Sequence, residues 1–551
     1  MPSLHEHLAT TSARKPSWPG VAIGESVLAL VLAMAAAACS KADPAPSPPN
    51  GSTTLVPSST PAPTAAHEGW EQGPAALERA LAAKTPVLLY VSSEWCPPCR
   101  ALEANLLSKP AFLDATKGLT RVRVDGDADG AQAIAERFEA RAYPTLLLLS
   151  GEGEELFRSH HAVSMEEIAP ALASAAAAGL GFKGALGRLG AGAATGADCA
   201  LLAAVDWGPA SGMTLSTEQR LAELKRAFEQ CKGAPDATRG LLAAHLLGLA
   251  ATADTAADSA LPGAAIKPME DALLESVLRN DETAWAARTL VATWATPVVS
   301  WVLGADRGPR FAALRDRWLR AAAAIRARSG APLDMQLLGY NAVLDLHRLE
   351  RGDAPLDAAS RAEIEAAVGR VDALARSPAE RHSIVPNAAY LLRSVGQPEK
   401  ARALLLAEVA RTDAPSYHLT TLSQWALADG RRDEARRFAR DAVTKARGRP
   451  SRLQWMVNEL SMYSSEPADR PVLLERAAEV YALLFDRDDA FLGRNRPRAA
   501  RLADLLGPLH DETAVKALVE RYSPRCDALP EESRSHCRKH FATLRTGAPR
   551  E

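Results

Sequence analysis

A Cys-x-x-Cys motif that directly follows a short apolar segment constrains this chain more than any other feature. The segment Pro86–Val91 reads Pro-Val-Leu-Leu-Tyr-Val, which is typical of a buried strand. The sequence Cys96-Pro97-Pro98-Cys99 follows shortly after it. Proline suits the first turn of a helix, where no N–H donors are needed, and a cysteine at a helix start is favoured as a thiolate. The motif therefore predicts a strand, a redox-active cysteine pair and a helix in direct succession.

The surrounding segments alternate between helix and strand patterns. Apolar spacing predicts helices over Pro74–Lys84, Ala101–Leu107, Ala131–Ala140 and Ser164–Ala176, and further strands over Leu119–Asp125, Leu146–Leu149 and Glu154–Arg158. This order predicts an α/β domain over residues 67–176.

Several short motifs stand at defined places in this domain: Trp95-Cys96-x-x-Cys99, Glu103, Ser108-Lys109-Pro110, Val124-Asp125 and Tyr143-Pro144-Thr145. On these motifs, residues 67–176 resemble a thioredoxin-fold domain, and within that fold they are most similar to the C-terminal periplasmic domain of DsbD-type electron transporters. The resemblance implies an α/β thioredoxin fold and thiol–disulfide oxidoreductase activity, with no cofactor.

The resemblance also implies roles for individual residues. Cys96 would be the attacking thiol and Cys99 the resolving one, and Glu103 would help to move the proton of the buried thiol. Pro144 would be a cis-proline beside the disulfide, with Trp95, Tyr143 and Pro144 forming the substrate-binding residues. One departure is Tyr90, which stands where thioredoxins usually carry a buried Asp.

The residue before the second cysteine bears on the direction of the reaction. Strong oxidants and isomerases tend to have His there, whereas this chain has Pro98, as thioredoxin does. This favours a reductase-type potential, on the order of −270 mV. A disulfide oxidase or isomerase with the same site remains the alternative.

Two metal interpretations compete with the redox one. Cys96 and Cys99 could be half of a zinc site completed by His160 and His161, but these histidines are more typical of surface residues. The segment Asp125–Gly130 with Glu136 fits the EF-hand loop pattern, although a strand precedes it and Gln132 occupies its apolar position. We therefore predict no metal site, and we expect no metal cluster in the rest of the chain.

The N-terminal segment has the layout of a secretory signal. Arg14 and Lys15 precede an apolar run over Val27–Ala38, and small residues then lead to Cys39. We expect residues 1–38 to be a signal peptide with a lipobox and Cys39 to be the lipidation site; a plain signal peptide or an uncleaved anchor are the alternatives. By resemblance, Ser40 favours the outer membrane. Residues 39–66 are rich in Pro and Ser and predict a disordered tether.

The remainder of the chain has helical periodicity. Residues 177–198 are rich in Gly and Ala and predict a linker, and residues 199–551 predict an all-α domain. Gly396 and Gly430, like Ala401 and Ala435, are 34 residues apart, which resembles tetratricopeptide repeats over 383–447. Ala439 and Ala442 continue the small-residue pattern in the second unit, whereas Glu408 departs from it in the first. Such an array binds a protein partner or only supports its neighbour.

The chain has seven cysteines, of which four lie beyond the predicted redox domain. An exported protein permits disulfides, and the spacing suggests pairing Cys199 with Cys231 and Cys526 with Cys537 as structural disulfides. Other pairings, or buried free thiols, remain open.

Charge and motifs together predict the function. Lys and Arg number 64 and Asp and Glu number 66, so the chain lacks the basic surplus of a nucleic-acid-binding protein. We expect an exported, membrane-tethered thiol–disulfide oxidoreductase on the periplasmic side of a bacterial cell envelope. Its partners would be protein dithiol or disulfide clients, an external electron donor and a protein bound by the helical domain. The alternative is a helical scaffold whose cysteine pair is structural or regulatory, which a heavily shielded Cys96 would favour.

Overall fold

The computed structural model describes residues 69–160, 164–165, 167–169, 172–173, 181–208, 213–256, 262–463 and 467–547. The predicted signal peptide, Cys39, the tether and His161 lie outside these residues. The described residues all belong to one compact unit. Among the helices of the described residues, none combines the length and apolarity needed to cross a membrane.

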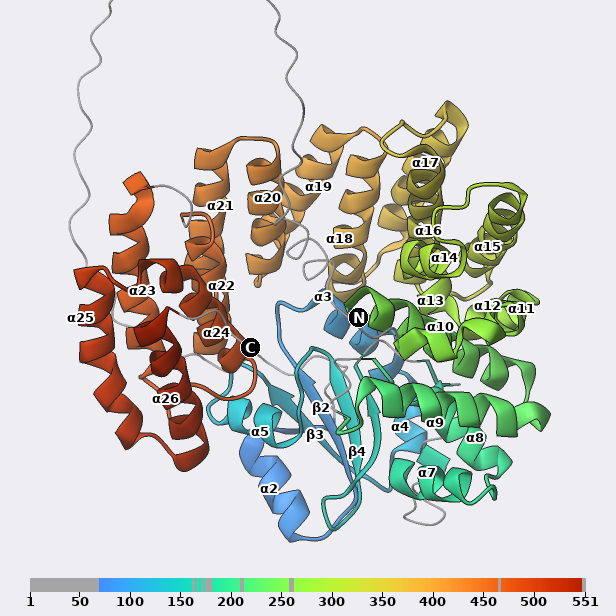
Figure 1. Cartoon of the computed structure of the whole chain (residues 1–551), viewed down its shortest axis with the longest axis horizontal. Helices are drawn as coiled ribbons and strands as arrows, with labels where there is room; N and C mark the ends of the chain where they lie inside the picture. The colour runs from blue at the N-terminus through green and yellow to red at the C-terminus, as the bar shows by residue number, and fades with distance from the viewer. Residues whose placement is uncertain are drawn as a thin grey trace, which may run out of the picture. The chain divides into compact units, whose positions relative to one another are not determined.

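Five strands form one mixed sheet in the order β1-β3-β2-β4-β5 (Figure 1). They are β1 (Glu71–Gln72), β2 (Val87–Ser92), β3 (Thr120–Asp125), β4 (Thr145–Leu149) and β5 (Glu155–Ser159). Strand β3 runs parallel to β1 and β2, whereas β4 runs antiparallel to β2 and β5. Strand β2, which precedes the cysteine motif, is therefore central and buried.

Successive apolar side chains of β2 point to opposite faces of the sheet. Leu88 and Tyr90 belong to the same core as Cys96 and Cys99. The alternate residues of β2 pack with apolar residues of α2 and α5 on the other face. The helices of this region are α2 (Pro74–Ala82), α3 (Pro97–Leu102), α4 (Pro110–Ala115) and α5 (Ala131–Arg137), and a π-helical turn over Glu103–Leu107 continues α3. The predicted α/β arrangement is confirmed.

The predicted linker over residues 177–198 is wrong in its central part, which forms helix α7 (Phe182–Gly190). Ala185 and Leu189 of α7 are buried, and Phe182 packs edge-on against Trp207 with ring centroids 5.4 Å apart. Phe182, Ala185 and Leu189 are spaced three and four residues apart and form one apolar face of α7. The high Gly and Ala content concealed this spacing.

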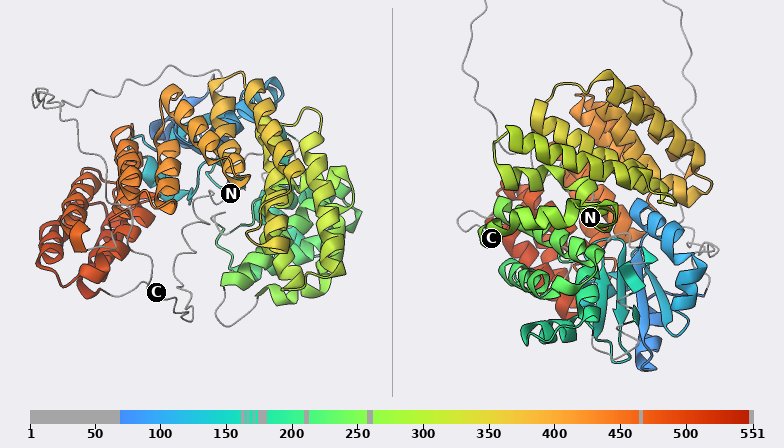
Figure 2. Two further views of the ribbon diagram at one scale, coloured as in Figure 1. Left: turned by 90° about the horizontal axis from the view of Figure 1, so that it is seen from above. Right: turned by 90° about the vertical axis from the view of Figure 1, so that its right-hand side faces the viewer.

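The predicted all-helical second part is also confirmed, and most of its helices pack against the next helix in chain order (Figures 1 and 2). The first half comprises α8 (Gly196–Ala204), α9 (Thr217–Gln230), α10 (Asp236–Ala256), α11 (Glu270–Leu278), α12 (Asp281–Ala286), α13 (Arg288–Thr293), α14 (Ala295–Leu303), α15 (Pro309–Ala327), α16 (Leu333–Arg351) and α17 (Ala358–Leu374). The second half comprises α18 (Pro378–Ser394), α19 (Pro398–Arg411), α20 (Ser416–Ala428), α21 (Arg432–Thr444), α22 (Arg449–Leu460), α23 (Arg470–Leu484), α24 (Asn495–Leu506), α25 (Thr513–Tyr522) and α26 (Glu531–Thr546).

Helices α18 to α21 form two successive hairpins with the 34-residue period. Gly396 and Gly430 occupy the connections with φ of +80° and +76°, a conformation that glycine adopts without strain. Ala401 and Ala435 are fully buried just inside the second helix of each hairpin. A small side chain at this point allows the two helices of a hairpin to pack closely.

Two disulfides join elements of the helical part. Cys199 of α8 is bonded to Cys231 at the end of α9, and Cys526 is bonded to Cys537 of α26. All four cysteines are buried. Each bond therefore closes a loop between helices that are near neighbours in sequence.

Candidate functional site

Cys96 and Cys99 lie at the start of α3 and form a disulfide. Cys96 is the N-cap residue, and the backbone N–H of Cys99 donates to its Sγ at 3.2 Å. Because Pro97 and Pro98 have no N–H, Cys99 supplies the first free backbone donor of the helix. A hydrogen bond from this donor would stabilise a thiolate on Cys96 once the pair is reduced.

The peptide bond between Tyr143 and Pro144 is cis and directly precedes β4. Thr145, the next residue, is paired with Val91 near the end of β2. The cysteine motif begins a few residues after that end of the strand. The hydroxyl of Thr145 is hydrogen-bonded to Nδ1 of His160 at 2.8 Å. The interpretation of His160 as a surface residue is wrong, since its side chain is buried at the end of β5.

Glu103 is buried one turn after Cys99 and is bound by two side chains. The hydroxyl of Tyr90 donates to Glu103 Oε1 at 3.2 Å, and Arg100 donates to Glu103 Oε2 at 2.6 Å. Tyr90 also lies 3.4 Å from the carbonyl oxygen of Cys99. Burial raises the pKa of Tyr90 well above its ordinary value, so its hydroxyl remains a neutral donor. Tyr90 therefore links the ionisable carboxyl group of Glu103 to the cysteine motif.

Trp95, the residue before Cys96, contacts the helical part of the chain. Its indole Nε1–H donates to Ser451 Oγ at 2.5 Å, and its ring packs edge-on against Trp455 with centroids 5.2 Å apart. Its carbonyl oxygen lies 3.3 Å from Nε2 of His382. These partners belong to α18 and α22. The tryptophan that was predicted to contact the substrate is therefore in contact with helices of the same chain.

Tyr143 is enclosed in the same way. The guanidinium group of Arg494 lies over its ring at 4.4 Å, and the amide of Gln132 donates to its hydroxyl at 3.3 Å. Burial raises the pKa of Tyr143 to about 12. We call α18, α22 and residues 487–496 the cover. With the cover in place, the side chain of Cys96 is 2% exposed and that of Cys99 is fully buried.

The segment that fits the EF-hand pattern is a docking surface for the cover. Asp127 accepts hydrogen bonds from the backbone N–H and the hydroxyl of Ser451, at 2.7 and 2.6 Å. Asp129 pairs with Arg487 at 2.9 Å. Glu136, the residue at the last position of the pattern, accepts from the backbone N–H of Gly493 at 2.7 Å. These carboxylates therefore bind protein donors of the cover.

Close backbone approach is part of this docking. A Cβ atom at Gly448, just before α22, would lie 2.1 Å from Cβ of Asp127. A Cβ at Gly493 would lie 2.7 Å from the carbonyl oxygen of Gln132. Any larger residue would force the cover away from the loop, so both positions require glycine.

Asp127 makes the docking dependent on pH. Burial, and then the neighbouring carboxylate of Asp125, raise the pKa of Asp127 to about 7, above the value of about 3.9 in an unfolded chain. Between these two values the folded chain binds more protons, so the free energy of unfolding falls as the pH rises. We expect Asp127 to contribute a loss of roughly 3 kcal/mol between pH 4.5 and pH 7.5 in urea denaturation. Asp127→Asn should remove this contribution.

Asp129→Asn is the matched control, because the side chain of Asp129 is 94% exposed. It should leave the pH dependence of the free energy of unfolding unchanged. A slope that Asp127→Asn does not alter would contradict the assignment to Asp127.

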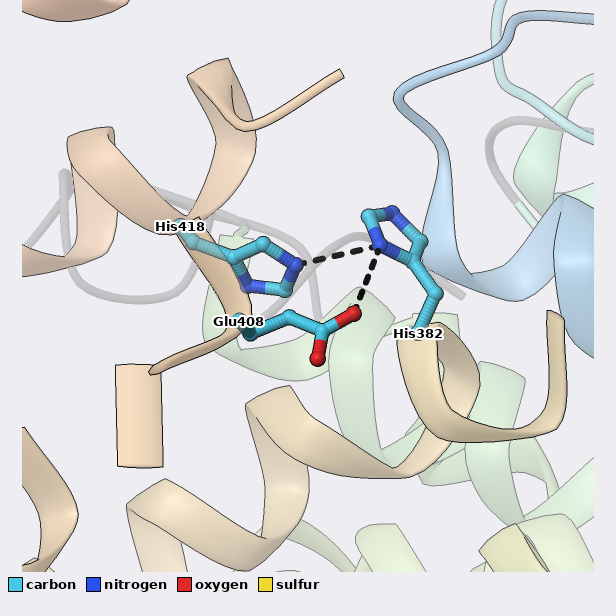
Figure 3. A group of neighbouring side chains, drawn as sticks. All are labelled: His382, Glu408 and His418. Atoms are coloured by element: carbon cyan, nitrogen blue, oxygen red, sulfur yellow. Dashed lines mark hydrogen bonds and ion pairs between the residues drawn. The ribbon is translucent and has the colours of Figure 1, made fainter. Parts of the chain in front are cut away.

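A second polar cluster, which includes His382 of the cover, was missed at the sequence level. His382, Glu408 and His418 are buried together, and their potential ligand atoms all lie within 4.8 Å of one another (Figure 3). We expected no metal cluster in this part of the chain, and the three residues lie on three successive helices rather than in one local motif. The one available signal was Glu408, which interrupts the small-residue pattern of the repeats.

Comparison with known proteins locates the similarity in the first part of the chain. The family model of the thioredoxin-like domain matches residues 73–176. The thiol:disulfide interchange protein DsbD 2 of Pseudomonas aeruginosa is 37% identical over 102 residues, which cover 17% of this chain and 17% of that protein. The thiol:disulfide interchange protein DsbD of Klebsiella pneumoniae is 32% identical over 85 residues, covering 15% of this chain and 14% of that protein.

A plant protein shows similarity of the same extent. Thioredoxin H3 of Arabidopsis thaliana is 34% identical over 79 residues, covering 14% of this chain and 61% of that protein. The chain thus matches a small part of the DsbD proteins and less than two thirds of the thioredoxin. The sheet order, the Cys96–Cys99 pair after β2 and the cis peptide bond before β4 agree with these matches. Residues 73–176 of this chain are a thioredoxin-like domain, followed by a large helical region.

Proposed function

We propose that the protein is a thiol–disulfide oxidoreductase that acts through Cys96 and Cys99. The observation that carries this proposal is the placement of the pair at the start of α3, with the N–H of Cys99 directed at the sulfur of Cys96. The similarity of residues 73–176 to thiol:disulfide interchange proteins supports it. Pro98 favours reduction of client disulfides over their formation.

The exchange takes place in two steps. The Cys96 thiolate attacks one sulfur of a client disulfide, which forms a mixed disulfide and releases the other client sulfur as a thiolate. The Cys99 thiolate then attacks Cys96 Sγ, which forms the Cys96–Cys99 disulfide and releases the second client thiolate. Two electrons pass to the client, and an external dithiol donor must return them.

Other residues have positioning roles in this proposal. As the resemblance implies, Glu103 accepts the proton of the Cys99 thiol before the second step; it is buried one turn after Cys99, and Tyr90 bridges it to the carbonyl oxygen of that residue. Tyr143 and Pro144 present backbone groups to an extended client segment, and Trp95 contacts it beside Cys96. A lipid anchor on Cys39, the tether over 39–66 and a position on the periplasmic side of a bacterial envelope complete the proposal.

The burial of Cys96 favours a second candidate, in which the pair is a structural or regulatory disulfide of a helical scaffold. With Trp95 and Tyr143 held by the cover, a client cannot reach the sulfur of Cys96. Catalysis therefore requires the cover to open, and the cover would regulate access. In the scaffold candidate the cover stays closed and the disulfide is never exchanged.

Trapping of mixed disulfides separates these candidates. Cys99→Ser leaves Cys96 able to attack but removes the thiol that resolves the mixed disulfide. We expect the reduced variant to form stable mixed disulfides with model peptide disulfides and with envelope proteins, detected by mass spectrometry at Cys96. The double variant Cys96→Ser, Cys99→Ser is the control and should trap none. Equal recovery from both variants would contradict an exchange reaction at Cys96.

A further inference from the structure

Three side chains from successive helices converge in the interior of the helical region. His382 lies on α18, Glu408 on α19 and His418 on α20, and they point toward one another (Figure 3). Their exposed fractions are 4%, 3% and 0%. Two imidazoles and a carboxylate out of contact with water are unfavourable unless they are compensated by hydrogen bonds or by a bound cation.

The distances fit a small metal ion. His418 Nε2 lies 3.2 Å from His382 Nδ1, and His382 Nδ1 lies 3.8 Å from Glu408 Oε1. Tetrahedral zinc with bonds of about 2.0–2.1 Å separates its ligand atoms by roughly 3.3 Å. Small side-chain adjustments would therefore bring all three atoms into a coordination sphere with a fourth position left open.

Contacts outside the cluster orient its members as metal ligands. Nε2 of His382 faces the carbonyl oxygen of Trp95, which can only accept, so Nε2 carries the hydrogen and Nδ1 presents a lone pair to the cluster. Glu408 Oε2 accepts from Nε of Arg381 at 3.0 Å, which leaves Oε1 directed at His382. Backbone carbonyls and charged donors hold metal-binding His and Glu residues in the same way.

Charge also favours a cation. Arg381 is shared between Glu408 and Asp372, so two carboxylates compete for one guanidinium group. Ala442, 34 residues after Glu408, occupies the equivalent repeat position with an uncharged side chain. The repeat architecture alone therefore does not require a carboxylate here.

We infer that His382, Glu408 and His418 bind a divalent transition-metal cation, with zinc the best match. Two nitrogen ligands favour zinc over magnesium or calcium, which prefer oxygen ligands. The bound ion would join α18, α19 and α20. Through His382 it would also strengthen the contact with Trp95 beside the cysteine pair. The inference stands whether or not the cysteine pair exchanges disulfides.

Zinc titration of the full chain tests this site. The protein is prepared without a polyhistidine tag, is stripped with a chelator that is then removed, and keeps its disulfides oxidised so that thiols do not compete. We expect one zinc per chain by elemental analysis and by calorimetry. Glu408→Gln and His418→Gln should each weaken zinc binding at least 100-fold.

Glu459→Gln is the matched control, because Glu459 is also buried and paired with an arginine, Arg476, but lies outside the cluster. It should bind zinc as the parent protein does. Circular dichroism confirms that each variant is folded. The inference would be overturned if the parent protein bound no stoichiometric zinc. Equal zinc affinity in the parent protein and both cluster variants would overturn it as well. In either case the cluster would be a proton-sharing network.

Discussion

Replacing Cys96 by serine will reduce the rate of disulfide exchange at least 1000-fold. A serine hydroxyl is not appreciably ionised near neutral pH and forms no disulfide, so the first step of the exchange is lost. The N–H of Cys99 would instead donate to the serine oxygen, which preserves the start of α3. The assay is reduction of a peptide disulfide with a dithiol as electron donor, at several protein concentrations.

Cys526→Ser is the control for this prediction. It removes a disulfide that is far along the chain from the predicted site. The folded fraction of this variant should keep most of the exchange activity of the parent protein. A Cys96→Ser variant that retains a substantial fraction of the parental rate would show that another group performs the exchange.

Opening the cover is expected to have the second large effect. Ser451 is buried and binds both Asp127 and Trp95, so Ser451→Glu places a second carboxylate against Asp127 and removes a donor that Asp127 uses. We expect this change to destabilise the closed arrangement by about 2 kcal/mol, which corresponds to about a 30-fold larger open population. Reduction of the Cys96–Cys99 disulfide should accelerate by a similar factor. The rate is followed by alkylation and mass spectrometry after mixing with a phosphine reductant.

The neighbouring residue provides a matched control. Arg452 lies on the same helix but is exposed to solvent, and Arg452→Glu changes the charge of α22 by more than Ser451→Glu does. It should leave the reduction rate near that of the parent protein. Equal acceleration by both variants would indicate a general charge effect, and no acceleration by Ser451→Glu would indicate that the cover does not limit access to Cys96.

The sequence was sufficient to predict the thioredoxin-like fold, because local signals there agree with the global arrangement. The apolar strand β2, the prolines at the start of α3 and the alternation of β3 each specify one element. The helical nature of the second part was predictable from periodicity for the same reason. The position of α7 was missed because its face relies on three apolar residues within a Gly- and Ala-rich segment.

The cover and the buried cluster could not be predicted, because they depend on how separate helices pack. The cover contacts join residues hundreds of positions apart, whereas the cluster joins three successive helices within 36 residues. Asp127 and Ser451 are separated by 324 residues, and neither carries a local signal of the other. The acidic pattern at Asp125–Gly130 was recognised as fitting an EF-hand loop, and the metal interpretation was set aside because a strand precedes it. Its carboxylates proved to be acceptors for donors on the cover.

The reduction potential of the Cys96–Cys99 pair is the most direct test of the proposed exchange. The parent protein is equilibrated with glutathione and dithiothreitol buffers of known potential, and the fraction of reduced pair is measured by alkylation. We expect a reversible two-electron couple near −270 mV, in the range of thioredoxin, and we expect Ser451→Glu to reach equilibrium with the buffer more quickly. In contrast, the pair could stay oxidised in every buffer in which the parent protein and Ser451→Glu remain folded. That result would contradict the proposed exchange and identify the disulfide as structural.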